Sequence, residues 1–200
     1  MNILIDLLPK EVTIDNKEYK INSDFRTSIL FELLMQDSSI GEEDKILMAL
    51  QLYYPQIPMN INGAIEKMLW FYRCGKDISK SKGNGKGKSV TQIYSFEYDD
   101  DYIYAAFMDQ YNIDLQDIDY LHWWKFKAMF KSLKEDNEIV KMMGYRSMDL
   151  SKVKDKEQKA YYKKMKDLYK IPTQISKDEE EKLKEIEKVL QNGGDLSELL

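Results

Sequence analysis

Apolar residues recur at intervals of three and four positions along most of this 200-residue chain, which is the spacing of an α-helix with one buried face. The pattern is densest in DYLHWWKFKAMFKSL, where one row holds Trp123, Phe126 and Phe130 and a second row starts at Trp124. Lysines occupy the remaining side. This segment therefore predicts a helix with a broad apolar face and a narrow basic stripe.

Start and stop signals divide the rest of the chain into further helices. Ser23 or Asp24 can cap a helix through FRTSILFELLM, and GEEDKILMALQLYY carries acids in its first turn, where the helix dipole favours them. We expect a third helix, in NINGAIEKMLWFYRCG, to be closed by Gly75. A later helix runs through 139–143, where Gly144 either ends it or permits close packing.

Strand signals are strongest near the N-terminus. VTIDNKEYKI has two β-prone runs around Asp15 and Asn16, which predicts a small hairpin. The expected fold is mostly α: a compact multi-helix domain over 1–172, with an N-terminal β-hairpin and a peripheral polar helix and tail over 173–200. That last helix has only a thin apolar stripe, so we expect it to be dispensable for folding.

Residues 81–89 read SKGNGKGKS and end in Gly-Lys-Ser, as a nucleotide-binding P-loop does. The P-loop spacing requires a glycine at the position of Lys82. The segment before it reads as a helix, whereas a P-loop follows a buried strand. We therefore expect an exposed, mobile, Lys-rich loop over 78–89 that binds no nucleotide.

The chain contains no pattern typical of catalysis or of a metal site. Cys74 and His122 are its only cysteine and histidine, so they cannot build a zinc site by themselves and no internal disulfide can form. Asp99, Asp100 and Asp101 stand together, but no EF-hand spacing follows them, and the start of a helix in DYIYAAFMDQY explains them better. We expect no enzyme, no cofactor and no metal.

Composition and charge narrow the class further. No run approaches the roughly 20 apolar residues that a membrane span needs, and MNILIDLLPKE lacks the basic leader of a signal peptide. The net charge of −5 argues against bulk nucleic-acid binding. A Lys-rich helix over 152–170, opened near Asp155 and ended by Pro172, precedes an acidic segment over 176–200. Such charge runs are usually solvent-exposed faces, and here they favour weak mutual attraction.

Two adjacent tryptophans on one helix point about 100° apart, so both rarely bury fully against one neighbour. Two interpretations stay open: both lie in the core, or one lies in the core while the other contacts a partner. His122, beside them, is interpreted as structural or as a hydrogen-bonding contact. The candidate partner-binding residues are the aromatic and methionine side chains of this region: Trp123, Trp124, Phe126, Phe130, Met142 and Met143.

The strings LHWWKFKAMFKSL and MGYRSMDL are long and unusual, and over residues 1–172 the chain resembles the gene-product-fifteen family of tailed phages and prophages of Gram-positive bacteria. The resemblance implies a gene from the tail-morphogenesis region, close to the tape-measure gene. Proteins in that position resemble tail assembly chaperones, which coat the tape-measure protein until the tail tube polymerises around it. It thus implies a non-catalytic partner of the tape-measure protein in the host bacterial cytoplasm, and a homo-oligomer is compatible with that role.

Two other functions remain open. A structural virion component, such as a head–tail completion or tail protein, would use the same surfaces permanently. The negative net charge disfavours a nucleic-acid-binding accessory protein. Such a protein would use the lysines in and beside the Lys-rich loop over 78–89: Lys76, Lys80, Lys82, Lys86 and Lys88.

Overall fold

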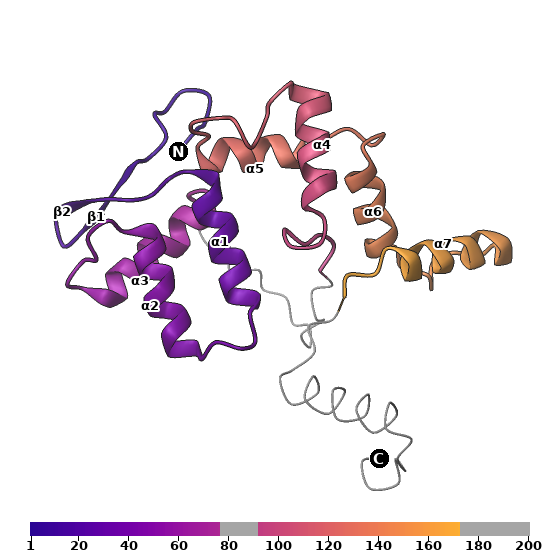
Figure 1. The fold of residues 1–200 in the computed structure, drawn as a ribbon, viewed down its shortest axis with the longest axis horizontal. Helices are drawn as coiled ribbons and strands as arrows, with labels where there is room; N and C mark the ends of the chain where they lie inside the picture. The colour runs from indigo at the N-terminus through magenta and orange to yellow at the C-terminus, as the bar shows by residue number, and fades with distance from the viewer. Residues whose placement is uncertain (77–91, 173–200) are drawn as a thin grey trace, which may run out of the picture.

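The computed structural model describes residues 1–76 and 92–172, which form a mostly helical fold of seven helices and one two-stranded sheet (Figure 1). This confirms the fold class expected from the spacing of apolar residues. The loop predicted over 78–89 and the polar helix and tail predicted over 173–200 lie outside the described residues.

The sheet is the predicted N-terminal hairpin. Strand β1, Glu11–Ile14, pairs antiparallel with β2, Lys17–Lys20, so that Ile14 lies opposite the first residue of β2. The connecting residues Asp15 and Asn16 both have a positive φ, 50° and 61°. A two-residue hairpin turn of this kind needs left-handed backbone at both positions, which Asp and Asn tolerate best among residues with a side chain.

Three helices follow the hairpin: α1 Phe25–Gln36, α2 Glu42–Tyr53 and α3 Ile61–Tyr72. The cap of α1 is as predicted, because the Asp24 carboxylate accepts a hydrogen bond from the Arg26 backbone N–H at 3.0 Å. The end of α3 is also as predicted. Gly75 follows it with a φ of +68°, and a Cβ at this position would lie 2.7 Å from the Trp124 ring. Glycine is therefore required there both by the backbone and by the neighbouring ring.

Four more described helices complete the fold: α4 Asp100–Tyr111, α5 Trp123–Lys131, α6 Glu138–Ser147 and α7 Lys156–Leu168. Figure 1 shows α5 lying between α1 and α4. The prediction for Gly144 was wrong. Helix α6 continues through it to Ser147, and a Cβ at Gly144 would meet no atom within 4 Å, so the glycine neither ends the helix nor admits a neighbour.

The core is centred on Phe126 of α5, which is fully buried. Its ring stacks on Phe25 of α1 and on Phe107 of α4, with 4.9 Å between ring centroids in each pair. Stacked rings at this distance contribute beyond the area that they bury. Helix α5 thus joins α1 and α4, which are far apart in sequence, into one aromatic cluster.

Candidate partner-binding groove

A groove of about 640 Å³ lies between α1 and α4, and Phe25 and Phe126 of the aromatic cluster belong to its lining. Its apolar lining includes Phe25, Ile29, Leu30, Phe96, Ile103 and Leu115. The rings of Phe25 and Phe96 are buried and form its floor, whereas Leu30 on α1 is 51% exposed. An apolar depression of this size with an exposed leucine at its edge is typical of a site that receives apolar side chains from another molecule.

Charged residues of both signs border the groove. Asp100 and Asp101 lie exposed in the first turn of α4, where the helix dipole favours acids. Arg26 lies on α1 and donates to the backbone carbonyls of Leu115 at 2.9 Å and Ile118 at 2.8 Å. These two bonds hold the 112–122 connection against α1, so that it forms a fixed wall of the groove.

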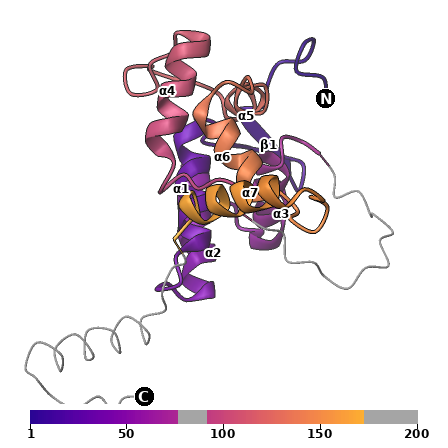
Figure 2. The same cartoon turned by 90° about the vertical axis from the view of Figure 1, so that its right-hand side faces the viewer.

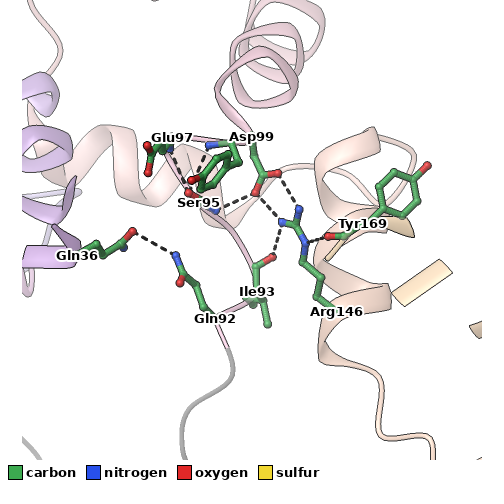
Figure 3. Close-up of polar contacts among 9 residues, drawn as sticks. Gln36, Gln92, Ile93, Ser95, Glu97, Asp99, Arg146 and Tyr169 are labelled. Atoms are coloured by element: carbon green, nitrogen blue, oxygen red, sulfur yellow. Dashed lines mark hydrogen bonds and ion pairs between the residues drawn. The ribbon is translucent and has the colours of Figure 1, made fainter. Parts of the chain in front are cut away.

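A buried ion pair fixes the segment that carries Phe96 (Figure 3). The Arg146 guanidinium of α6 binds both carboxylate oxygens of Asp99, with Nη1–Oδ2 at 2.6 Å and Nη2–Oδ1 at 2.8 Å. Asp99 also accepts a hydrogen bond from the Ser95 backbone N–H at 2.8 Å. Both partners of the pair are buried, so this segment is locked to α6 beside the groove.

Arg146 is a structural residue and has little capacity left for a ligand. Besides the ion pair, its Nη1 donates to the Ile93 carbonyl at 3.1 Å and its Nε to the Tyr169 carbonyl at 2.6 Å. These bonds engage four of the five N–H groups of the guanidinium. Among the described residues that border a cleft of about 670 Å³ beside Arg146, there is therefore no free buried cation for an anion.

The two tryptophans are both core residues, and the interpretation that exposes one of them was wrong. Trp123 is fully buried and Trp124 is 4% exposed. The Trp123 indole N–H donates to the Tyr72 carbonyl and that of Trp124 to the Phe71 carbonyl, each at 2.8 Å. Carbonyls in the last turn of a helix have no partner within it. The end of α3 therefore serves both indoles, although they point in different directions.

The other candidate residues are also largely covered. Phe126, Phe130 and Met142 are buried, and Met143 is half-buried. As the fold places them, five of the six candidates offer a partner almost no surface, and their predicted role in partner binding stays untested. Sequence spacing identified the apolar face of α5 correctly, but it could not show that α1, α3 and α4 cover that face.

His122 is both structural and a hydrogen-bonding residue, so both interpretations are confirmed. Its Nδ1 accepts a hydrogen bond from the Trp124 backbone N–H at 3.0 Å and so caps α5, while Nε2 donates to the Pro9 carbonyl at 3.0 Å. Burial lowers the pKa of His122, because a charged imidazolium would lose its hydration there.

The aspartates at the start of α4 have separate roles. Asp100 and Asp101 lie in the first turn of the helix, as expected, but Asp99 binds Arg146 instead of capping α4 with its side chain. Among residues 1–76 and 92–172, no three acidic, histidine or cysteine side chains are grouped as a metal site would require. Within the same ranges, no helix has the length and apolar character to span a membrane.

Comparison with known proteins gives one match. A family model described as Bacteriophage Gp15 protein matches residues 4–171, which is most of the chain and nearly all of the part that the structure describes. No curated protein and no solved structure matches it.

Proposed function

Because this chain belongs to the Bacteriophage Gp15 protein family, we propose that it is a tail assembly chaperone that binds the tape-measure protein while the phage tail is built. The family indicates a structural or morphogenetic role in a phage. In the role that we propose the protein is non-catalytic, acts in the host cytoplasm and contacts its partner through the α1–α4 groove.

The groove is the observation that carries the proposal. A tape-measure protein is a long helix that exposes apolar side chains before the tail tube surrounds it, and helices of that kind bind partners by inserting apolar residues into a groove. The α1–α4 groove has an apolar floor and charged edges, which keep the free protein soluble and discriminate between partners. In the proposed role each groove binds with modest affinity, which suits a partner that must be released.

Avidity would make many weak contacts sufficient. If many copies bind along one tape-measure helix, the assembly is stable as a whole while each copy still exchanges. The growing tail tube can then displace the copies one after another.

The test is co-expression with the tape-measure protein of the same phage, followed by co-purification. Leu30→Asp places a charge at the edge of the groove and should reduce the recovered tape-measure protein at least about tenfold, as loss of an interface anchor does. Leu47→Asp is the matched control, because Leu47 on α2 is equally exposed at 51% but lies outside the groove. Equal recovery with both variants, each checked for folding by circular dichroism, would contradict the proposal.

A structural virion component is the second candidate, and an apolar N-terminal segment that lies exposed favours it, since permanent subunits bury such segments against neighbours. Mass spectrometry of purified virions beside infected lysate separates the two functions. A chaperone should be found in the lysate alone, whereas a structural component should be found in virions at a fixed ratio to the other tail proteins.

A further inference from the structure

The N-terminal segment, residues 1–8, exposes more apolar surface than any comparable stretch of the described chain. Leu4, Ile5 and Leu7 are 90%, 80% and 94% exposed. Single exposed leucines are ordinary, but three large aliphatic side chains this exposed within four residues make an apolar surface that soluble proteins usually cover.

This segment is held in a defined shape. The Asn2 carbonyl accepts hydrogen bonds from the backbone N–H groups of Ile5 at 3.1 Å and Asp6 at 2.8 Å, which closes a turn. The base of the segment is attached to the body, because Leu8 packs against the core and the Pro9 carbonyl binds His122. The apolar side chains therefore project from a fixed base and a formed turn. The segment then loses little conformational entropy when it binds.

The α1–α4 groove is complementary to this segment in polarity and in charge. Its apolar floor matches the aliphatic side chains in chemistry. The segment and its base carry one acid, Asp6, and one base, Lys10, while the groove is bordered by Arg26 on α1 and by Asp100 and Asp101 on α4. Arg26 is already paired with Asp24 at 3.3 Å, so the exposed Asp100 and Asp101 set the charge of this edge. Lys10 is the charge that complements them, an arrangement that fixes orientation more than it adds affinity.

The segment and the groove are separate surfaces, because the residues that line the groove include none of residues 1–8. In both views α5 lies between the N-terminus and α4 (Figures 1 and 2). A contact between two different patches is heterologous, so that each copy can donate to one neighbour and accept from another.

We propose that residues 1–8 of one copy dock into the α1–α4 groove of a second copy, and that the protein associates head to tail in this way. The contact repeats from copy to copy and gives a ring if the rotation closes or a filament if it does not. Because it occupies the groove assigned above to the tape-measure protein, self-association covers that groove until the partner competes for it. The self-association itself requires no tape-measure protein and can be tested without it.

The test is sedimentation velocity of the purified full chain over a range of concentrations. The wild type should sediment faster as concentration rises. Leu4→Ser combined with Ile5→Ser removes the docking side chains, and Leu30→Asp blocks the groove; each should remain monomeric at concentrations where the wild type associates. Leu47→Asp should behave as the wild type, because Leu47 is as exposed as Leu30 but lies elsewhere.

A mixture of the two association-deficient proteins gives the decisive result. The Leu4→Ser/Ile5→Ser protein keeps an intact groove and the Leu30→Asp protein keeps an intact segment, so an equimolar mixture should form a dimer and nothing larger. A monomeric wild type, a mixture that stays monomeric, or association of the Leu30→Asp protein alone would overturn the proposal. The serine variant should still bind the tape-measure protein, so that failure of either proposal is visible separately.

Discussion

Arg146 and Asp99 make a buried ion pair whose loss should strongly destabilise this molecule. Arg146→Leu leaves the buried Asp99 carboxylate without its counter-ion, and breaking a buried pair on one side costs about 3–5 kcal/mol. Urea unfolding should report that loss. Lys141→Leu on the same helix is the control, because its pair with Glu138 is exposed and contributes about 0–1 kcal/mol. Similar losses for both variants would show that burial of the Arg146 pair adds nothing.

Trp123 and Trp124 should prove equally sensitive to truncation. Each is buried and each donates to a carbonyl of α3, so Trp123→Ala and Trp124→Ala should both lower the free energy of unfolding by about 3–5 kcal/mol. Phenylalanine at either position keeps most of the ring but removes the N–H, and should cost about 1–3 kcal/mol. Denaturant titration of the four variants distinguishes packing from hydrogen bonding. A near-wild-type alanine variant at either site would contradict the burial found here.

His122 should make the stability of the fold depend on pH. Burial lowers its pKa in the folded state, so the unfolded chain binds a proton that the folded chain does not as pH falls below about 6.5. Stability is then fully present above that pH and declines below it, by at most about 1.4 kcal/mol per pH unit. His122 is the only histidine. His122→Asn retains an acceptor for the helix cap and should flatten the dependence of stability on pH between about pH 5 and 7, the range where histidine titrates. Thermal melts of both proteins across that range provide the measurement.

Single residues also show where sequence reasoning ends. The spacing of apolar residues placed Trp123 on the buried face of a helix, but its acceptor at Tyr72 lies 51 positions earlier in the chain. The acidic run was interpreted from its own neighbours, whereas Asp99 is paired with Arg146, 47 positions later. The local sequence pattern does not identify such partners, because helix packing determines which distant residues come into contact.

Among the elements, α7 should be the least stable of the described helices. It has no buried residue, and it is held through α6, by the Lys166 amine on the Met148 carbonyl and by the Tyr169 carbonyl on Arg146. Amide hydrogens of α7 should therefore exchange much faster than those of α5, which lies in the core. Hydrogen exchange followed by mass spectrometry of peptides from the two helices tests this. Equal protection would mean that another part of the chain covers α7.

Element boundaries were largely predictable, because caps and periodicity are local. Asp24 and Asp155 both accept from backbone N–H groups in the first turn of the helix that they open, as the sequence pattern indicated. The error at Gly144 has an energetic cause. A glycine inside a helix costs only about 0.5–1 kcal/mol, and burial of Ile139 and Met142 on the same helix exceeds that cost.

For the whole molecule, the two proposals together predict competition at one site. Since residues 1–8 and the tape-measure protein use the same groove, the Leu4→Ser/Ile5→Ser protein should bind a tape-measure fragment more tightly than the wild type when measured at concentrations where the wild type associates. Calorimetric titration at low and high protein concentration checks this, because the difference should vanish when the wild type is diluted to monomer. Weaker binding by the serine variant would mean that the segment takes part in partner binding.

The groove itself could not have been predicted from the sequence. Its two sides, α1 and α4, are separated in sequence by two helices and by residues 77–91, and the stacking of Phe25 and Phe107 on Phe126 brings them together. The resemblance to a phage family indicated the class of partner, and the apolar pattern indicated a core. The surface where a partner binds depends on which apolar residues the core leaves uncovered, and that is known only once the helices are packed.

The position of α5 has a consequence for how the chain is made. A ribosome releases α1, α2 and α3 well before α5. Until α5 is made, the carbonyls at the end of α3 and the ring of Phe25 lack their contacts with Trp123, Trp124 and Phe126. The nascent N-terminal half is therefore incomplete during translation and depends on contacts of long sequence separation, which form slowly. Closure of the body therefore begins when α5 emerges, and α6 then adds Ile139, which is fully buried in the same core.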